Sequence, residues 1–210
     1  MLDRLDYPPG ELMSFHHLAG NLGVPFHEIE NINTGHGSRV AREFQPDLIL
    51  SVKFGQIFKE PILSLPSFGI LNTHSGALPQ YAGLWAPVRT LLAGERRFTS
   101  TLHVVDQGID TGPVIASGHL PVEPNRSLFW HLPRLYVLGI ELFLQVLPGL
   151  TKCTRITAHR QENSRRRYYG KLTTEEEAAF EKQGFRFLDD RDYAEITRRF
   201  GVDLFTVSSE

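Results

Sequence analysis

Strand-like and helix-like segments alternate along residues 1–150, and this alternation is the feature that most limits the fold. Strands are predicted where apolar, β-branched and aromatic residues recur in short runs, at 47–54, 68–72, 98–106 and 113–122. Helices are predicted between them at 34–44, 57–65, 86–93 and 127–150. The last two strands are close in sequence and should pair antiparallel. This order predicts an α/β layered domain with an open, mostly parallel sheet and flanking helices.

Some segments are less regular. Residues 20–30 are predicted to form a helix end, a turn and a short strand. Pro133 either kinks the helix predicted at 127–150 or marks its true first turn. The character changes after residue 150, where a basic segment precedes two more predicted helices, at 173–182 and 190–200. We therefore divide the chain into a layered domain at 1–150 and a linker with a helical C-terminal appendage at 151–210.

Composition narrows the class of protein. The 210 residues carry a net charge of −2, which gives no general reason to expect binding to nucleic acid or to a membrane. A single cysteine, Cys153, rules out an internal disulfide and suits a reducing compartment. The longest apolar stretch, 135–150, is interrupted by polar and helix-breaking residues and is short for a membrane span. We expect a soluble cytoplasmic protein.

Two polar loops follow strand-like runs and hold the best candidates for chemistry. Asn72 and His74 lie two positions apart, so both side chains point the same way on an extended segment. Asp110 lies in the loop between the last two predicted strands. Open α/β sheets carry their functional loops at the carboxyl ends of the strands. If both loops belong to one sheet, His74 and Asp110 can face each other across its rim.

These three residue types suit acyl transfer from one amine to another. An imidazole beside a carboxylate can share proton transfer, because each group shifts the pKa of the other. A side-chain amide N–H can stabilise the negative charge that develops on a carbonyl oxygen. We therefore predict a catalytic site formed by Asn72, His74 and Asp110.

Structural explanations compete with this site. A histidine after a strand commonly serves only as a hydrogen-bonded structural residue, and Asp106 and Asp110 could simply shape tight turns. The oxygen ligands and the later glutamate of a calcium-binding EF-hand loop are missing here. Adjacent His16 and His17 diverge on a helix or a strand and make a poor metal pair. We predict no metal site.

The sequence from Asn72 to Gly83, followed by Asp-Gln-Gly-Ile-Asp-Thr-Gly-Pro-Val from Asp106, resembles the folate-dependent formyltransferase family. The resemblance extends from about Phe44 to Pro121. It implies transfer of a formyl group from 10-formyltetrahydrofolate to a small amine, such as an amino sugar or an amino-acid-derived amine. In this family Asn72 and His74 would bind and polarise the formyl group and Asp110 would set up proton transfer.

The resemblance also implies further binding residues. The backbone of a turn would hold the pterin ring on one side, namely Phe54, Gly55, Gln56, Ile57 and Phe58. The loop of Asp106, Gly108, Ile109 and Asp110 would close the other side. His103 would support Asp110, unless it is simply a polar residue on a half-buried strand. Tyr81, Gly83 and Trp85 would support the site or wall the acceptor pocket, and packing explains Trp85 equally well.

Two features depart from the family pattern. The strand, Gly-containing turn and helix that normally open the domain are not recognisable before Gly20, so the domain at 1–150 is expected to be incomplete at its N-terminus. A sheet edge exposed in this way favours a homodimer or a partner chain. The basic segment at 152–167 is interpreted as a solvated linker rather than an RNA contact. A 10-formyltetrahydrofolate hydrolase and a non-catalytic module that binds folate or a partner remain as alternatives.

Overall fold

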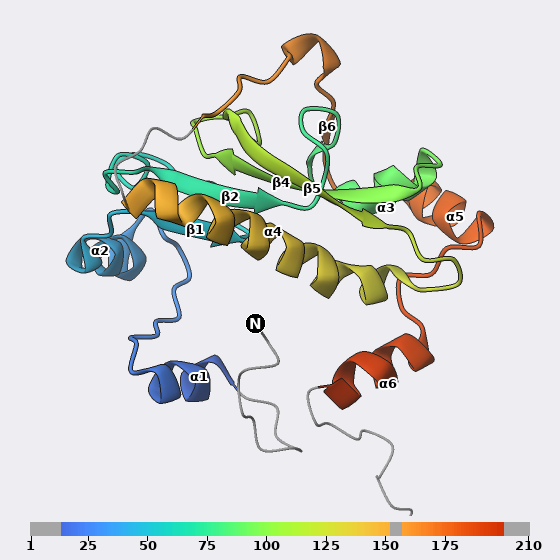
Figure 1. The fold of residues 1–210 in the computed structure, drawn as a ribbon, viewed down its shortest axis with the longest axis horizontal. Helices are drawn as coiled ribbons and strands as arrows, with labels where there is room; N and C mark the ends of the chain where they lie inside the picture. Colours follow the sequence, from blue (N-terminus) through green and yellow to red (C-terminus); the bar gives the residue numbers. More distant parts are fainter. Residues whose placement is uncertain (1–13, 152–156, 200–210) are drawn as a thin grey trace, which may run out of the picture.

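The computed structural model describes residues 14–151 and 157–199 (Figure 1). One sheet has its strands in the order β1-β2-β4-β5. These strands are β1 (Ile49–Val52), β2 (Ile70–His74), β4 (Arg97–Val104) and β5 (Val114–Pro121). A smaller sheet pairs β3 (Ala82–Gly83) with β6 (Tyr168–Tyr169). The helices are α1 (Phe15–Leu22), α2 (Gly35–Phe44), α3 (Ala86–Leu92), α4 (Leu128–Thr151), α5 (Thr174–Lys182) and α6 (Asp190–Arg199).

The α/β class predicted from the sequence is confirmed, and the larger sheet is mixed rather than mostly parallel. Within this larger sheet, β1 and β2 pair in parallel, whereas β4 is antiparallel to both β2 and β5. The short loop 105–113 explains the second antiparallel pairing, because a parallel connection needs a crossover of a dozen or more residues. β1 forms one edge of this sheet.

Two predicted elements are wrong. No helix forms at 57–65. Residues 60–64 form turns, where Ile62 N–H donates to the Lys59 carbonyl and Leu65 N–H to the Ile62 carbonyl. Pro61 lies inside this segment and Pro66 follows it. A residue before proline avoids the helical conformation, so too few residues remain to nucleate a helix. Residues 24–30 contain no assigned strand, and the helix end predicted before them belongs to α1.

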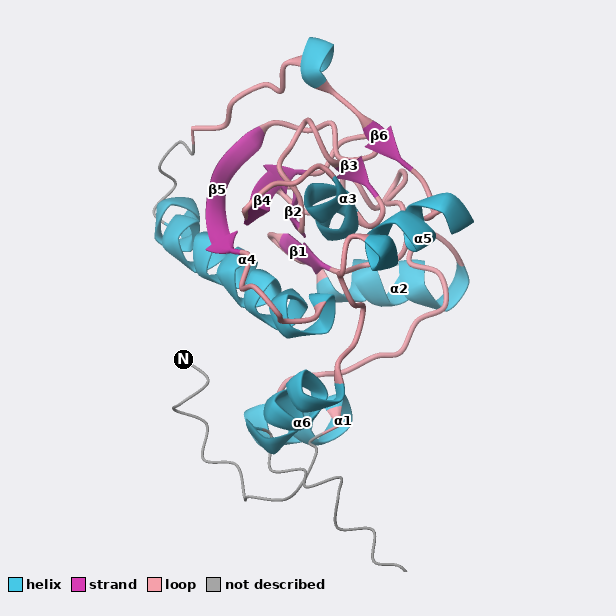
Figure 2. Cartoon of the chain, turned by 90° about the vertical axis from the view of Figure 1, so that its right-hand side faces the viewer, coloured by secondary structure: helices cyan, strands magenta, loops and turns pink. Residues whose placement is uncertain are grey.

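Helix α4 covers one face of the larger sheet and packs against β2, β4 and β5. It is one continuous helix of 24 residues that includes Pro133 and Pro148, so Pro133 does not mark its first turn. By length and apolar composition alone, α4 could cross a membrane. The same properties suit the core helix of a layered domain, which is how α4 packs here. Figure 2 shows α3 on the opposite side of the sheet.

The largest apolar cluster joins the C-terminal helices to the sheet. Val88 and Leu91 of α3, Phe98 of β4 and Leu135 of α4 enclose the side chain of Phe180 from α5, which is fully buried. The ring of Phe180 also lies 4.5 Å from that of Phe187 and 5.3 Å from that of Phe185. Residues beyond 150 therefore contribute to the core of the layered domain. The division at residue 150 stays a prediction.

A Phe180→Ala variant tests how far this cluster stabilises the whole fold. Removing a fully buried phenylalanine leaves a cavity and should lower the free energy of unfolding by about 3–5 kcal/mol. Urea denaturation followed by circular dichroism measures this change. Phe15→Ala provides the control, because the Phe15 side chain is 75% exposed and its removal should have little effect. Equal stability of the two variants would show that α5 packs on the domain without stabilising it.

Candidate active site

The two polar residues of β2 point away from α4. Thr73 lies between them and faces that helix, where a Cβ added at Gly139 would lie 2.9 Å from the Thr73 Cβ. Side chains alternate along a strand, so Asn72 and His74 project from the opposite face. The register of β2 and β4 pairs Asn72 with His103, which therefore projects from this face as well. Strand geometry thus gathers an amide and two imidazoles at one end of the sheet.

The loop after β4 brings Asp110 to the same place. One carboxylate oxygen, Oδ2, accepts a hydrogen bond of 2.7 Å from Gly83 N–H and lies 3.5 Å from His74 Nδ1. The other, Oδ1, lies 3.5 Å from His103 Nε2. Asp110 has a φ of 53°, in the left-handed region that residues with a side chain seldom adopt. The structure thus brings together Asn72, His74, His103 and Asp110.

Backbone carbonyls select the tautomers of the two imidazoles. His74 Nε2 lies 2.7 Å from the carbonyl oxygen of Tyr81, and His103 Nδ1 lies 2.9 Å from that of Val104. A carbonyl oxygen only accepts, so these two nitrogens carry the protons. In the neutral rings, the unprotonated nitrogens, His74 Nδ1 and His103 Nε2, then face Asp110. One additional proton can therefore be held between the carboxylate of Asp110 and either ring.

The side chain of Asn72 is oriented from both ends. Its Oδ1 accepts a hydrogen bond of 2.8 Å from Ser51 Oγ on β1, and its Nδ2 donates to His103 Nε2 over 3.1 Å. An amide nitrogen carries two protons. The second proton of Asn72 Nδ2 can be donated to a bound ligand.

Burial and neighbouring charges set the protonation states of His74 and Asp110. Burial lowers the pKa of His74, outweighing the carboxylate of Asp110 and the carbonyl of Tyr81, which act in the opposite direction. Burial by itself raises the pKa of Asp110, but contacts with His103, His74 and Gly83 N–H together outweigh it and lower that pKa. Near neutral pH, Asp110 is therefore ionised and His74 is neutral and able to take up a proton.

The same burial predicts a loss of stability in mild acid. Burial also lowers the pKa of His131, outweighing the carbonyl of Ser127. Below the ordinary histidine pKa of 6.5, the unfolded chain binds protons at His74 and His131 that the folded chain does not. The free energy of unfolding should therefore decrease from about pH 7.5 to about pH 5.5, above the range in which Asp110 titrates.

Urea denaturation at these two pH values measures that decrease. A His74→Gln variant removes one of the two groups and should show a smaller decrease than the wild type. An equal free energy of unfolding at both pH values would contradict the prediction.

The segment predicted to hold the pterin uses several side chains for its own structure. Gln56 Oε1 accepts from Ile32 N–H and its Nε2 donates to the Glu30 carbonyl, each over 2.9 Å. Phe58 is buried in a core cluster, and Phe54 stacks on it at 4.9 Å between ring centroids. The side chains of Gln56 and Phe58 thus shape this turn. The carbonyl of Ile57 accepts a hydrogen bond of 2.9 Å from Asn33 Nδ2, and Ile57 is half exposed.

The other predicted site residues lie around the site in different ways. Asp106 Oδ1 accepts a hydrogen bond of 3.0 Å from Gly108 N–H, so it shapes the loop that carries Ile109 and Asp110. The ring of Tyr81 turns away from the site, stacks on Tyr169 and donates its hydroxyl proton to Glu95. Trp85, just before α3, is about half exposed, and its ring centroid lies 6.2 Å from that of Phe187.

Sequence reasoning missed two groups that contact the site. Ser51 binds Asn72 from a neighbouring strand, and Gln161 binds the backbone of the Asp110 loop. Neither belongs to a local motif, so only their distance in space could have revealed them. Position 76 also requires glycine. A Cβ there would clash, because it would lie 2.9 Å from His74 Nε2 and 2.5 Å from the Cβ of Ala86. Its position inside the predicted polar loop was a usable signal.

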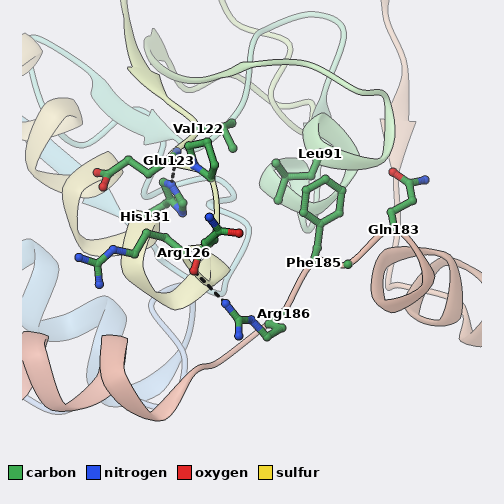
Figure 3. Close-up of a pocket in the computed structure, with 11 residues that line it drawn as sticks. Leu91, Val122, Glu123, Arg126, His131, Gln183, Phe185 and Arg186 are labelled. Atoms are coloured by element: carbon green, nitrogen blue, oxygen red, sulfur yellow. Dashed lines mark hydrogen bonds between the residues drawn. The ribbon is translucent and has the colours of Figure 1, made fainter.

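A cavity of about 440 Å³ lies elsewhere, between the end of β5, the start of α4 and the segment after α5 (Figure 3). Three of its polar side chains have partners in the protein. His131 Nε2 accepts from Glu123 N–H over 2.9 Å, and Arg186 donates to the carbonyl of Asn125 over 2.8 Å. Arg126 pairs with carboxylates of α6, including Asp192. None of the four site residues lines this cavity.

Within residues 14–151 and 157–199, the structure shows no cluster of three or more His, Cys, Asp or Glu side chains that could hold a metal ion. Lys152, Cys153 and Arg155 of the predicted basic segment lie outside the described residues.

Residues 26–147 match the sequence model of the formyl transferase family. The methionyl-tRNA formyltransferase of Trichlorobacter lovleyi is 32% identical over 166 residues, which cover 79% of this chain and 50% of that protein. The methionyl-tRNA formyltransferase of Kosmotoga olearia is 28% identical over 159 residues, with 76% and 51% covered. This chain thus spans about half the length of the curated relatives it matches.

Solved structures of formyltransferases have a similar fold. The N-formyltransferase of Helicobacter canadensis, in complex with folinic acid and dTDP-3-aminofucose, superposes with a TM-score of 0.59 and 25% identity, covering 75% of this chain and 54% of that one. A 4-N formyltransferase of Francisella tularensis gives a TM-score of 0.54 at 21% identity, with 68% and 63% covered. The second likeness concerns the fold alone.

Proposed function

This chain belongs to the formyl transferase family, and we propose that it transfers a formyl group from 10-formyltetrahydrofolate to an amine. The observation that carries the proposal is the convergence of Asn72, His74 and Asp110 at one end of the sheet. Asn72 and His74 come from β2 and Asp110 comes from the loop after β4, and the carboxylate lies 3.5 Å from the imidazole of His74. The folate supplies a formyl carbon that is open to attack by an amine.

Asn72 is the donor best placed to stabilise negative charge on the formyl oxygen. Its amide is held by Ser51 and His103, and its remaining Nδ2 proton can bind that oxygen. Both ring nitrogens of His74 already face protein groups, Tyr81 and Asp110. The role proposed for His74 is therefore narrowed from binding the formyl oxygen to moving a proton with Asp110.

Asp110 and His74 together accept the proton that the attacking amine must lose. Asp110 is ionised, and His74 Nδ1, which is unprotonated in the neutral ring, lies beside it. Protonation at Asp110 neutralises a buried carboxylate. Protonation at His74 instead creates an ion pair, in which Gly83 N–H stabilises the carboxylate of Asp110. The same proton is then available for the nitrogen that leaves.

The residues described here suit a pterin that is bound mainly by backbone groups. A pterin edge displays both donors and acceptors, which backbone amides match. The turn at 54–58 is held in place by the side chain of Gln56, and the exposed side chains of Ile57 and Ile109 supply apolar contacts. This assignment of the donor pocket remains a proposal.

We propose a small amine as acceptor, either an amino sugar or an amino-acid-derived amine. The comparison with the Helicobacter canadensis structure, whose complex contains an amino sugar nucleotide, favours the first. The methionyl-tRNA formyltransferases among the relatives favour a second candidate, the amine of an aminoacylated tRNA. The homodimer or partner chain predicted for the sheet edge remains a prediction.

An acceptor panel tests this function. The purified chain is incubated with 10-formyltetrahydrofolate and a dTDP-amino sugar, methionyl-tRNA or no acceptor, and formylated product and free formate are measured. We expect formylated product with one of the two amines. Formate release without any amine would identify a hydrolase instead. Folate binding without turnover in any reaction would identify a non-catalytic binding module.

A further inference from the structure

The segment 157–170 contacts both β3, whose Gly83 binds Asp110, and the chain that follows Asp110. It leaves the region after α4 and runs to β6, as the orange trace in Figure 1 shows. His159 exchanges two backbone hydrogen bonds with Val114, at 2.7 and 2.8 Å, just after the Asp110 loop. Tyr169 then pairs with Gly83, whose N–H binds the Asp110 carboxylate. This segment, the strap, thus contacts the chain on both sides of Asp110.

Gln161 is the residue of the strap that binds the Asp110 backbone directly. Its Nε2 donates to the carbonyl of Asp110 over 2.9 Å and to that of Gly112 over 2.7 Å. Two carbonyl acceptors settle the orientation of the amide, because only its NH₂ group can donate to both. Arg166 adds a hydrogen bond of 2.9 Å to the carbonyl of Ile109. Three carbonyls of this short loop are therefore held by strap side chains.

The loop needs such support because Asp110 adopts an unfavourable backbone conformation. Its φ of 53° is sterically disfavoured for a residue with a side chain. A strained conformation of this kind persists only when surrounding contacts determine it. Relaxation of φ at Asp110 would rotate its Cα–Cβ bond and carry the carboxylate away from His74 and His103.

We propose that Gln161 is a positioning residue that holds the carboxylate of Asp110 between His74 and His103 by fixing the backbone carbonyls of Asp110 and Gly112. Gln161 acts through the backbone of the loop. The proposal rests on the proposed function for its effect on turnover, whereas the geometry it describes can be measured without any substrate.

Two substitutions remove the donor in different ways. Gln161→Leu keeps a similar volume without a polar group, and Gln161→Glu keeps the shape but presents oxygen atoms to the two carbonyls. Gln183→Leu is the matched control, because Gln183 follows α5 and lies among the residues that line the cavity of Figure 3. Thermal melts and circular dichroism confirm which variants are folded.

The first readout is the kinetics of formyl transfer. Misplacing a catalytic group by about 1 Å can cost about 10²-fold in rate, so we expect kcat to fall by about that factor in both Gln161 variants. KM for the amine should change by less than about threefold, since contacts made equally with bound substrate and transition state are kept. Folded Gln161 variants with wild-type kcat would overturn the proposal.

The second readout is the imidazole ¹⁵N spectrum of His74, measured without substrate. Loss of the nearby carboxylate in either Gln161 variant should move the His74 resonances in the direction seen for Asp110→Asn. Gln183→Leu should leave them unchanged. Wild-type His74 resonances in both Gln161 variants would overturn the proposal, even if turnover is lost. If the wild type transfers no formyl group, this spectrum still decides whether Gln161 positions Asp110.

Discussion

An Asp110→Asn variant is expected to lose about 10²-fold or more of its formyl-transfer turnover, the scale of general acid–base catalysis. Asparagine keeps the shape of the side chain and can still accept from Gly83 N–H, but it cannot take a proton from the attacking amine. Burial alone raises the pKa of Asp110, and His103, His74 and Gly83 N–H together lower it. The carboxylate is therefore ready to accept a proton at neutral pH. Steady-state kinetics with the active acceptor measure the loss.

His74→Ala should reduce turnover on the same scale, because it removes the group that shares the proton with Asp110. Asp47→Asn is the matched control, since Asp47 is exposed and precedes β1 at the opposite end of the strands from the site. Full activity in both Asp110→Asn and His74→Ala would refute the catalytic assignment. A loss that is equal in Asp47→Asn would point to a general effect of charge instead.

An Asn72→Ala variant should lose about 10²–10³-fold in kcat, the cost of removing one donor to a developing oxyanion. Asn72 is the amide whose orientation is settled from both ends, by Ser51 Oγ at 2.8 Å and by His103 Nε2 at 3.1 Å. Such a preorganised donor needs no rearrangement when charge develops on the formyl oxygen. The loss should appear in kcat and in kcat/KM alike, because the interaction strengthens only in the transition state.

A graded series separates this role from a structural one. Ser51→Ala leaves Asn72 in place but removes the donor to its Oδ1, so the amide can rotate and kcat should fall by about tenfold, which corresponds to one lost hydrogen bond. Ser64→Ala is the control, since the Ser64 hydroxyl donates to the Glu60 carboxylate in an exposed turn. If Ser51→Ala and Ser64→Ala have equal kcat, the orientation of Asn72 by Ser51 is irrelevant to the reaction.

Periodicity and local motifs account for the parts of the fold that were predicted. The alternation of strand-like and helix-like runs indicated the α/β class. It failed for the short strand predicted within 20–30 and for the helix predicted at 57–65, which contains Pro61 and precedes Pro66. Apolar residues recur there at helical spacing, but the two prolines disfavour a helix, and the structure shows turns. The loop between β4 and β5 is too short for a parallel connection, which is why their antiparallel pairing could be predicted. The antiparallel pairing of β2 with β4 depends on which strands become neighbours in the folded sheet.

The local spacing of Asn72 and His74 already placed both side chains on one side of a strand. The role of His103 was left open, because its distance from Asn72 depends on the register between β2 and β4. Ser51 and Gln161 were not predicted at all. Each contacts the site from a segment that is distant in sequence, and serine and glutamine are common on any protein surface.

The sequence by itself determined the chemical groups of this protein and their local directions, because strand alternation and motif spacing act over a few residues. Only the tertiary structure decided which of these groups meet. Strand register brought His103 to Asn72, and contacts with Gly83 and the strap brought the strained Asp110 loop to His74. The reason is physical: distances of about 3 Å between side chains arise from the packing of whole elements, which no local pattern encodes.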